Sequence, residues 1–501
     1  MFLKIIIGRV SPGSSGLLRG DLRRYQLSPI SFLPANILIV RFQLTLLLTA
    51  CSTYYLQDFS IALSLPETNN MGNTSRRKAL KAIGLAGLGI TTISTGAAAS
   101  PPPSSQDHVA KGFWDSVRDQ FLLDRKTVFF NPGTVGAMPR VVVERMTSHL
   151  NMLASDVAQW AYLDDNAEQY ISGYNNLLPI RTAVGTLLNC SPSEVAMTDN
   201  VTNGMSYLAS GLDLSEGDEI ITTNQEHSGG ISSWKMRAKR HNLVYREVPI
   251  PKPIKDPSQV YDLITSSFTP KTRVLMVSHM ITGSGALLPV KEICAAARKR
   301  GIITILDGAQ TIGQVKVDIR DIGCDAYLGC FHKWIGAPCG TGFMYVQKDL
   351  MPRVWTTVAS GRWENHEDEG FRFTQRGTGS FSILKGLEAA LEYHQQLGPE
   401  NVYARIKQLG LRLREGLRKN KKIRIFSPED ESMCAGITVY NLEGWKGKYL
   451  QQEFWDRERM RPRSQGNEFG LRHCTHIFNS EAEIDRAIAL VDRLSTESPK
   501  G

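Results

Sequence analysis

The sequence predicts an α/β protein, with a large domain built on a mainly parallel seven-stranded sheet covered by helices and a smaller C-terminal α+β domain. Three observations predict this class. Beyond residue 100, short apolar runs alternate with longer helical stretches. Most of these runs lack polar alternation, as strands covered on both faces do. From about residue 375, long amphipathic helices replace the alternating pattern.

Seven short segments are the candidate strands of the large sheet. Each is rich in aliphatic residues and is followed by turn residues or a helix-length stretch. They span residues 194–198, 218–223, 242–250, 273–280, 302–306, 325–329 and 342–346. Between the fourth and fifth, residues 290–300 have apolar side chains at helical spacing and stop at Gly301, so a covering helix is predicted there.

The domain boundaries follow from where the pattern changes. The large domain is predicted over residues 129–374, after a linker and an N-terminal helix at 100–128, and the small domain over 375–501. In the small domain, two long amphipathic helices are followed by short apolar runs and a closing helix. They are predicted as helices at 384–398, 402–419 and 481–494 and strands at 424–428 and 436–442.

Residues 71–99 resemble a twin-arginine export signal, because Arg76 and Arg77 precede a glycine-rich apolar run that ends in small residues. The alternative of a membrane anchor is disfavoured, since the run is shorter than the about 20 strongly apolar residues that a span requires. The signal predicts the export machinery as a partner and a periplasmic or otherwise extracytoplasmic location. Met71 stands where a start residue belongs, so residues 1–70 are predicted to be an unstructured leader or to lie upstream of the true start.

Charge and cysteine content exclude several classes of protein. The formal net charge is +9, but residues 1–100 hold ten basic and three acidic residues, so most of the excess lies there. The rest of the chain is nearly neutral and has no clustered positive charge for nucleic acid or an anionic membrane. The cysteines after Cys51 are scattered and odd in number, which predicts buried free thiols rather than a disulfide framework.

Polar residues that follow strands are the candidates for chemistry, because ligands of open α/β sheets bind at the carboxyl ends of strands. Lys333 follows the strand at 325–329 among bulky apolar neighbours, where partial desolvation favours the free, nucleophilic amine. A surface lysine is the alternative for this position. Asp307 ends the strand at 302–306 and could keep a pyridine nitrogen protonated, or could cap a helix.

Three further places carry suitable groups. The helix start within Thr198–Ser206, with the Thr202 hydroxyl, is suited to a phosphate, although any capped helix start looks similar. His227 could stack on a flat ring or be structural. Arg472 has the fork that binds a carboxylate through two hydrogen bonds. The histidines and the cysteine just after Arg472 fit no common zinc spacing, so no metal is predicted.

Together these residues provide the groups of a pyridoxal phosphate enzyme that acts on an amino acid. From about Phe129 to Leu494 the chain resembles the class V aminotransferase family of fold-type I pyridoxal phosphate enzymes, which includes cysteine desulfurases and isopenicillin N epimerase. The motifs that carry the resemblance occur in the family's order: FFNPGTVGAMP, DNVTNG, EHSGG, SHMITGSGALLPV, DGAQ, HKW, RGTGS and RHCTHIFNSEAEID. GCFHKW is closest to the isopenicillin N epimerase-like branch.

The resemblance implies a role for each site residue. Lys333 is expected to form the Schiff base with the cofactor, and Asp307 to pair with the pyridine nitrogen. The remaining roles are Gln310 on the ring oxygen, His227 stacked on the ring, Val201, Thr202 and His332 on the phosphate, Arg472 on the substrate carboxylate, and Thr378 on the partner subunit's phosphate. The role of Thr378 implies a homodimer.

Two departures from the family pattern narrow the predicted reaction. Cys330 stands where desulfurases usually have a phosphate-binding serine, and residues 457–470 lack the nucleophilic cysteine of the desulfurases. A desulfurase is therefore disfavoured. The prediction is a reaction at the α-carbon of an amino acid, as an epimerase-like enzyme or an aminotransferase. A β-eliminating lyase and an exported, non-catalytic binding protein on the same fold are the alternatives.

Overall fold

The computed structural model describes residues 112–156, 158 and 175–499. The described residues belong to one compact unit. The leader and the export signal lie outside the described residues, as does the linker up to residue 111, so they stay predictions. Within the described ranges, no helix is long and apolar enough to cross a membrane.

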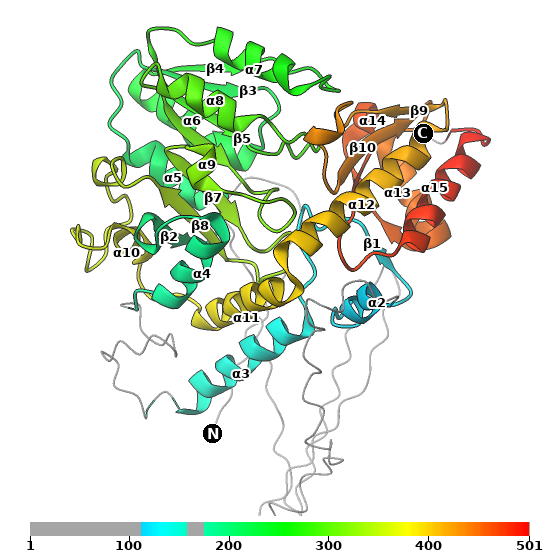
Figure 1. Cartoon of the computed structure of the whole chain (residues 1–501), viewed down its shortest axis with the longest axis horizontal. Coiled ribbons are helices and arrows are strands. Elements are labelled where there is room, and N and C mark those ends of the chain that lie inside the picture. The colour runs from blue at the N-terminus through cyan, green and yellow to red at the C-terminus, as the bar shows by residue number, and fades with distance from the viewer. Residues whose placement is uncertain (1–111, 157, 159–174, 500–501) are drawn as a thin grey trace, which may run out of the picture. The chain divides into compact units, whose positions relative to one another are not determined.

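The large sheet has seven strands in the order β2-β8-β7-β6-β5-β3-β4, and each predicted strand is present (Figure 1). Strand β8 is antiparallel to both of its neighbours, and the other pairs are parallel. The prediction of a mainly parallel sheet is confirmed. The strands are β2 (Val195–Thr198), β3 (Glu219–Thr223), β4 (Val244–Val248), β5 (Thr272–Ser278), β6 (Ile303–Asp307), β7 (Ala326–Cys330) and β8 (Gly342–Val346).

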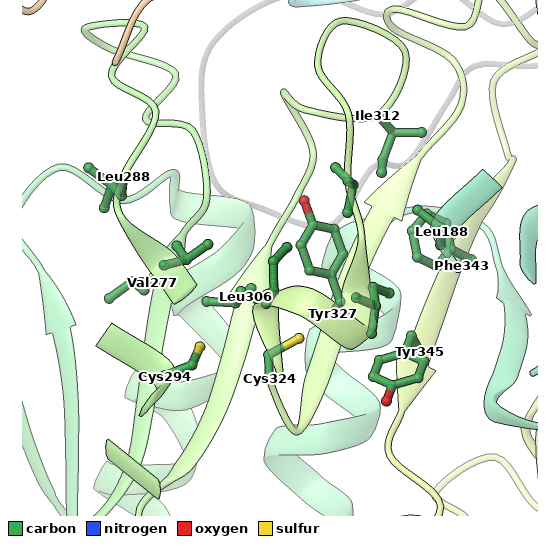
Figure 2. Close-up of a cluster of buried hydrophobic side chains, with 14 of the residues drawn as sticks. Leu188, Val277, Leu288, Cys294, Leu306, Ile312, Cys324, Tyr327, Phe343 and Tyr345 are labelled. Atoms are coloured by element: carbon green, nitrogen blue, oxygen red, sulfur yellow. The ribbon is translucent and has the colours of Figure 1, made fainter. Parts of the chain in front are cut away.

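Helices cover both faces of this sheet, because alternate residues of its strands point to opposite sides. Leu275 and Val277 of β5 pack in one core cluster with α4, α7, α8 and α9, while Val274 and Met276 pack in another with α5 and α6. Figure 2 shows part of the first cluster, where Leu306 of β6 and Tyr327 of the adjacent β7 lie side by side. The helices are α4 (Leu178–Leu188), α5 (Val201–Gly211), α6 (Ser228–His241), α7 (Pro257–Ser266), α8 (Val290–Arg298) and α9 (Ile319–Ile322).

Helix α8 ends before Gly301, whose φ of +66° suits the left-handed turn predicted there. Strand β4 is the least buried of the seven strands, because it lies at the sheet edge, and 42% of the Val244 surface is exposed. All seven described cysteines are free. Five are buried, as the sequence predicts, while Cys190 is half-buried and Cys339 is exposed.

The C-terminal part has a four-stranded antiparallel sheet in the order β12-β13-β10-β9, with α12 and α15 packed against it. Its strands are β9 (Ile423–Ile425), β10 (Ile437–Leu442), β12 (Arg463–Ser464) and β13 (Leu471–Cys474). Its helices are α11 (Phe381–Leu397), α12 (Pro399–Arg418), α13 (Gly447–Glu458), α14 (Gly466–Phe469) and α15 (Glu481–Ser495). The α+β character matches the prediction, although α13, α14 and β12 were not predicted.

Two N-terminal elements pack against later parts of the chain. Strand β1 (Val128–Phe129) pairs in parallel with β11 (Met460–Arg461), so the residues around 129 lie beside the C-terminal part. Helix α3 (Arg140–Asp156) packs along α11 (Figure 1). At this contact His149 Nδ1 lies 3.1 Å from Ser382 Oγ. The other described α-helices are the short α2 (Phe113–Arg118) and α10 (Glu369–Thr374), and three 3-10 helices lie at η3 (Pro192–Glu194), η4 (Met351–Arg353) and η5 (Glu431–Met433). The predicted boundary at 374/375 stays a prediction.

Candidate active site

A cavity of about 390 Å³ opens at the carboxyl ends of the parallel strands and is closed on its other side by the C-terminal sheet. It brings together eight of the nine site residues predicted from the sequence. They are Val201, Thr202, His227, Asp307, Gln310, His332, Lys333 and Arg472. A larger hollow, about 1260 Å³, lies along α7 and α8, but no predicted site residue lines it. The smaller cavity is therefore the candidate active site.

Thr378 is the predicted residue that the structure places elsewhere. It lies in the exposed turn after α10 and lines a separate hollow with Arg376 and Gly340. Its expected partner is the phosphate site of a second subunit. The structure holds one chain, so this role stays a prediction.

Lys333 lies in the turn that follows β7, and its half-buried side chain lines the cavity. Both neighbours are fixed: His332 O accepts a 2.7 Å hydrogen bond from Gly136 N, and Trp334 Nε1 donates to Gln310 Oε1 at 2.9 Å. A Cβ added at Gly136 would collide with the Lys333 carbonyl, so only glycine allows this close approach. The turn is therefore held on both sides, and it presents the half-buried Lys333 side chain at the cavity.

Asp307 ends β6 with only 5% of its surface exposed. Its Oδ1 accepts a 2.9 Å hydrogen bond from Ala309 N. The next helix, α9, starts only at Ile319, so the helix-cap alternative is wrong. Burial raises the pKa of this carboxyl, while the Ala309 N–H and the charges of Lys333 and His227 oppose the rise. A buried carboxylate without an ion pair is costly unless a cation comes to lie beside it.

The first turn of α6 lacks side chains where it faces the cavity. A Cβ on Gly230 would lie 2.9 Å from Asp307 Oδ2, and a Cβ on Gly229 would lie 2.6 Å from Thr202 Oγ1. Any larger residue would thus fill the space between the carboxylate and the start of α5. The two glycines keep that space open for a ligand.

His227 is the N-cap of α6, and its Nδ1 accepts a 3.1 Å hydrogen bond from Gly229 N. Burial and the nearby charge of Lys333 lower its pKa, which favours the neutral imidazole. The structural and functional interpretations of this histidine are compatible, because a capping imidazole held by one nitrogen still lines the cavity with its ring.

The start of α5 forms the anion-binding end of the cavity. Asn200 caps the helix by accepting from Asn203 N at 2.9 Å, and Val201 and Thr202 lie in the first turn, where N–H groups have no partner inside the helix. His332 Nδ1 is buried without a hydrogen-bond partner among the described residues. Cys330 also lines this end, and burial raises the pKa of its thiol to about 11. A protonated thiol replaces the serine that desulfurases usually have.

Gln310 joins three segments of the chain. Its Nε2 donates to Gly133 O at 2.9 Å and to Thr282 Oγ1 at 3.0 Å, and its Oε1 accepts from Trp334. Both amide hydrogens are therefore used within the protein. A hydrogen bond to a cofactor oxygen would have to replace one of them, so the expected contact stays a prediction.

Arg472 lies on β13 at the opposite end and is only 1% exposed. Its guanidinium donates to Thr282 Oγ1 at 2.7 Å and to Asn131 Oδ1 and Thr134 Oγ1 at 3.0 Å each. These neutral acceptors hold the group in place and leave its charge uncompensated. The histidines that follow are core residues: His473 packs on Phe130 and Tyr440, and His476 Nε2 contacts Trp334 O at 2.9 Å.

Sequence analysis missed three residues at or beside the cavity. Arg463 and Gln465 line it from the β12 segment, in the loop that carries no cysteine. Glu226, next to His227, contacts the cavity lining, where its Oε2 accepts a 2.9 Å hydrogen bond from Ser278 N. Burial, together with the charge of Asp307, raises the pKa of Glu226 to about 7. The turn at Gly466 and Gly470 before the Arg472 strand was the available signal for a hairpin that returns Arg463 to the site.

Comparison with known proteins decides the family. The family model described as aminotransferase class-V matches residues 127–485. The chain belongs to the aminotransferase class-V family. Isopenicillin N epimerase from Amycolatopsis lactamdurans is 30% identical over 407 residues, which cover 76% of this chain and 98% of that protein. A probable cysteine desulfurase from Xylella fastidiosa (strain 9a5c) is 25% identical over 432 residues, covering 79% and 97%.

Among solved structures, a lysine variant of C-DES with glycine covalently linked to its PLP cofactor has a TM-score of 0.66 and 26% identity, covering 75% of this chain and 99% of that chain. The class V protein described here is thus a pyridoxal phosphate-dependent enzyme of fold type I. Its own residues fit the cofactor: a buried carboxylate, a cradle that a Cβ would fill and an unpartnered His332 nitrogen.

Proposed function

We propose that this class V enzyme acts at the α-carbon of an amino acid, as an epimerase-like enzyme or an aminotransferase. The observation that carries the proposal is the convergence of Lys333, Asp307 and Arg472 on one cavity. Pyridoxal phosphate supplies an aldehyde that condenses with amines and a cationic ring that withdraws electrons from the α-carbon. The chain supplies binding, orientation and proton transfer.

Each residue has a task that its surroundings support. The N–H groups at the start of α5 and the Thr202 hydroxyl, with His332, would hold the phosphate. Asp307 would keep the proton on the ring nitrogen, and His227 would lie against the ring. Lys333 Nζ, the one lysine among the described cavity residues, would move the proton at the α-carbon.

The similarity to isopenicillin N epimerase favours an epimerase-like reaction. A desulfurase remains disfavoured, because Arg463 and Gln465 line the cavity where the desulfurase cysteine would be expected. Cys474 is fully buried in β13, so it does not replace that cysteine. The β-eliminating lyase gains no residue-level support.

The decisive test is a screen of amino acids for changes in cofactor absorbance, with and without a keto-acid acceptor. An epimerase or aminotransferase would exchange the α-proton for deuterium in D2O, and only the aminotransferase would need the acceptor for turnover. Release of ammonia together with pyruvate would instead identify a β-eliminating lyase. An absence of any spectral change or exchange would favour the non-catalytic alternative.

Arg472→Gln is expected to raise KM for the amino acid about 100-fold while kcat falls less, because the lost charge-assisted hydrogen bonds hold the substrate carboxylate in both ground and transition state. Steady-state kinetics on the holoenzyme measure both constants. Arg461→Gln is the matched control, since that guanidinium lies over the Trp455 ring at 4.0 Å and does not line the cavity. A KM within threefold of the wild-type value would contradict the assignment of Arg472.

The export signal and the homodimer are part of the same proposal. A cofactor made in the cytoplasm is bound before export if the chain crosses the membrane folded, as twin-arginine substrates do. Arg76→Lys with Arg77→Lys is expected to leave at least about 90% of the protein in the cytoplasmic fraction, because the machinery reads the paired arginines. Cell fractionation and N-terminal sequencing of the exported form measure this, and unchanged export of the double variant would refute the signal.

A further inference from the structure

Two arginines lie next to each other on adjacent strands of the small sheet, at the end of the cavity where the substrate is expected. Arg463 of β12 and Arg472 of β13 are direct partners in the antiparallel register, and both line the cavity. Both donate to one oxygen: Thr134 Oγ1 accepts from Arg463 at 2.9 Å and from Arg472 at 3.0 Å. Like charges directly opposite each other destabilise a sheet, so this pair needs an explanation outside the fold.

No carboxylate among the described residues forms an ion pair with either arginine. Their recorded acceptors are neutral oxygens of threonine and asparagine side chains and of the Thr282 backbone. Burial lowers the pKa of Arg463, and the nearby charge of Arg472 lowers it further. A pair of close cations in a cavity is stabilised when anions enter from solution.

The other charges of the cavity do not neutralise the pair. Asp307 is the only carboxylate among the described lining residues, and it belongs to the cofactor end with Lys333. The cofactor's phosphate is expected at the start of α5. The substrate end is therefore left with two positive charges and no negative one.

The two guanidinium groups differ in their free donors. Arg472 is buried and uses both terminal nitrogens on protein oxygens, so its Nε is the donor without a partner among the described residues. Arg463 is exposed at the cavity mouth, and its side chain makes one hydrogen bond within the described part of the chain. Arg463 can therefore offer most of its planar fork to a ligand. Gln465, from the same segment, provides a neutral amide beside it.

We infer that the substrate is an amino acid with a second carboxylate on its side chain, which Arg463 binds while Arg472 takes the α-carboxylate. This rests on the proposed function and narrows it to acidic amino acids or larger substrates that end in a carboxylate. If each arginine binds one carboxylate of the substrate, the ligand itself neutralises both positive charges. This explains why no protein carboxylate lies beside the pair. A neutral amino acid would leave the Arg463 charge unmatched.

Binding without turnover tests the inference. Succinate, glutarate and adipate are titrated into the holoenzyme by calorimetry, each beside its monoamide, which has the same shape and one charge fewer. The best-fitting diacid is expected to bind at least about tenfold more tightly than its monoamide, as charge-assisted hydrogen bonds from arginine predict. In Arg463→Gln this ratio should fall to about one, whereas Arg461→Gln should keep it.

Arg463→Lys, which keeps the charge and loses the fork, should give an intermediate ratio, and it serves if the glutamine variant does not fold. Equal binding of diacid and monoamide to the wild type, or a ratio unchanged in both Arg463 variants, would overturn the inference and would mean that both arginines hold one carboxylate. The proposed function is judged separately. It fails if no amino acid, acidic or neutral, changes the cofactor spectrum, whatever the diacids do.

Discussion

Lys333→Ala is expected to abolish turnover, with kcat falling by more than about 10³-fold, because the variant loses both the cofactor attachment and the proton carrier at the α-carbon. No other lysine among the described residues lines the cavity, so no neighbouring amine can take over. The purified variant should also lack the absorbance band at about 420 nm that a protein-bound pyridoxal phosphate gives. Borohydride reduction and peptide mapping of the wild type should find the pyridoxyl group on Lys333.

Two further variants separate chemistry from charge and from folding. Lys333→Arg keeps a cation in the cavity but cannot condense with an aldehyde, so it should be as inactive as the alanine variant. Lys348 is an exposed lysine two residues beyond β8. The Lys348→Ala variant should therefore keep both the absorbance band at about 420 nm and the turnover of the wild type. Wild-type turnover in Lys333→Ala, or a pyridoxyl group on another peptide, would disprove the assignment.

The large sheet could be predicted because its strands are buried on both faces, and such strands have continuous apolar sequences. Runs such as Val274–Val277 are apolar throughout, since their alternate residues enter two different core clusters. The sequence of helix α13 has no comparably clear apolar pattern. The helix buries Leu450 and Phe454 but also Glu453, so its apolar face is narrow and its polar residues hide the period.

The site was predictable where one strand end determines the position of a side chain. Asp307 and Lys333 follow adjacent strands of one sheet, so their proximity follows from topology alone. Arg463 could not be placed in this way, because it enters the cavity only through the pairing of β12 with β13. The hydrogen bonds of Gln310 were equally hidden, since Gly133 and Thr282 reach it from segments far away in the sequence.

Asp307→Asn is expected to lower kcat about 10³-fold, because a neutral amide cannot keep a proton on the ring nitrogen and the ring then withdraws electrons less strongly. The cofactor-free variant should nevertheless be at least as stable as the wild type at pH 8. Burial raises the pKa of Asp307 above its unfolded value. The folded state thus holds the proton more tightly than the unfolded state, and stability falls as pH rises between the two pKa values. Asparagine removes that loss.

Thermal melts of the cofactor-free proteins at pH 5 and pH 8, together with kcat of the reconstituted enzymes, measure both effects. Asp325→Asn is the matched control, because Asp325 Oδ2 accepts 2.7 Å hydrogen bonds from Thr304 N and Oγ1 at the far end of the same sheet. Replacing the Asp325 carboxylate should lower the melting temperature, because these hydrogen bonds are lost, but should leave kcat unchanged. If Asp307→Asn instead melted lower and kept kcat within tenfold, the carboxylate would be a structural group. A carboxylate that lowers the stability of the cofactor-free protein and is nevertheless needed for turnover indicates a site whose charge is matched to that of its ligand.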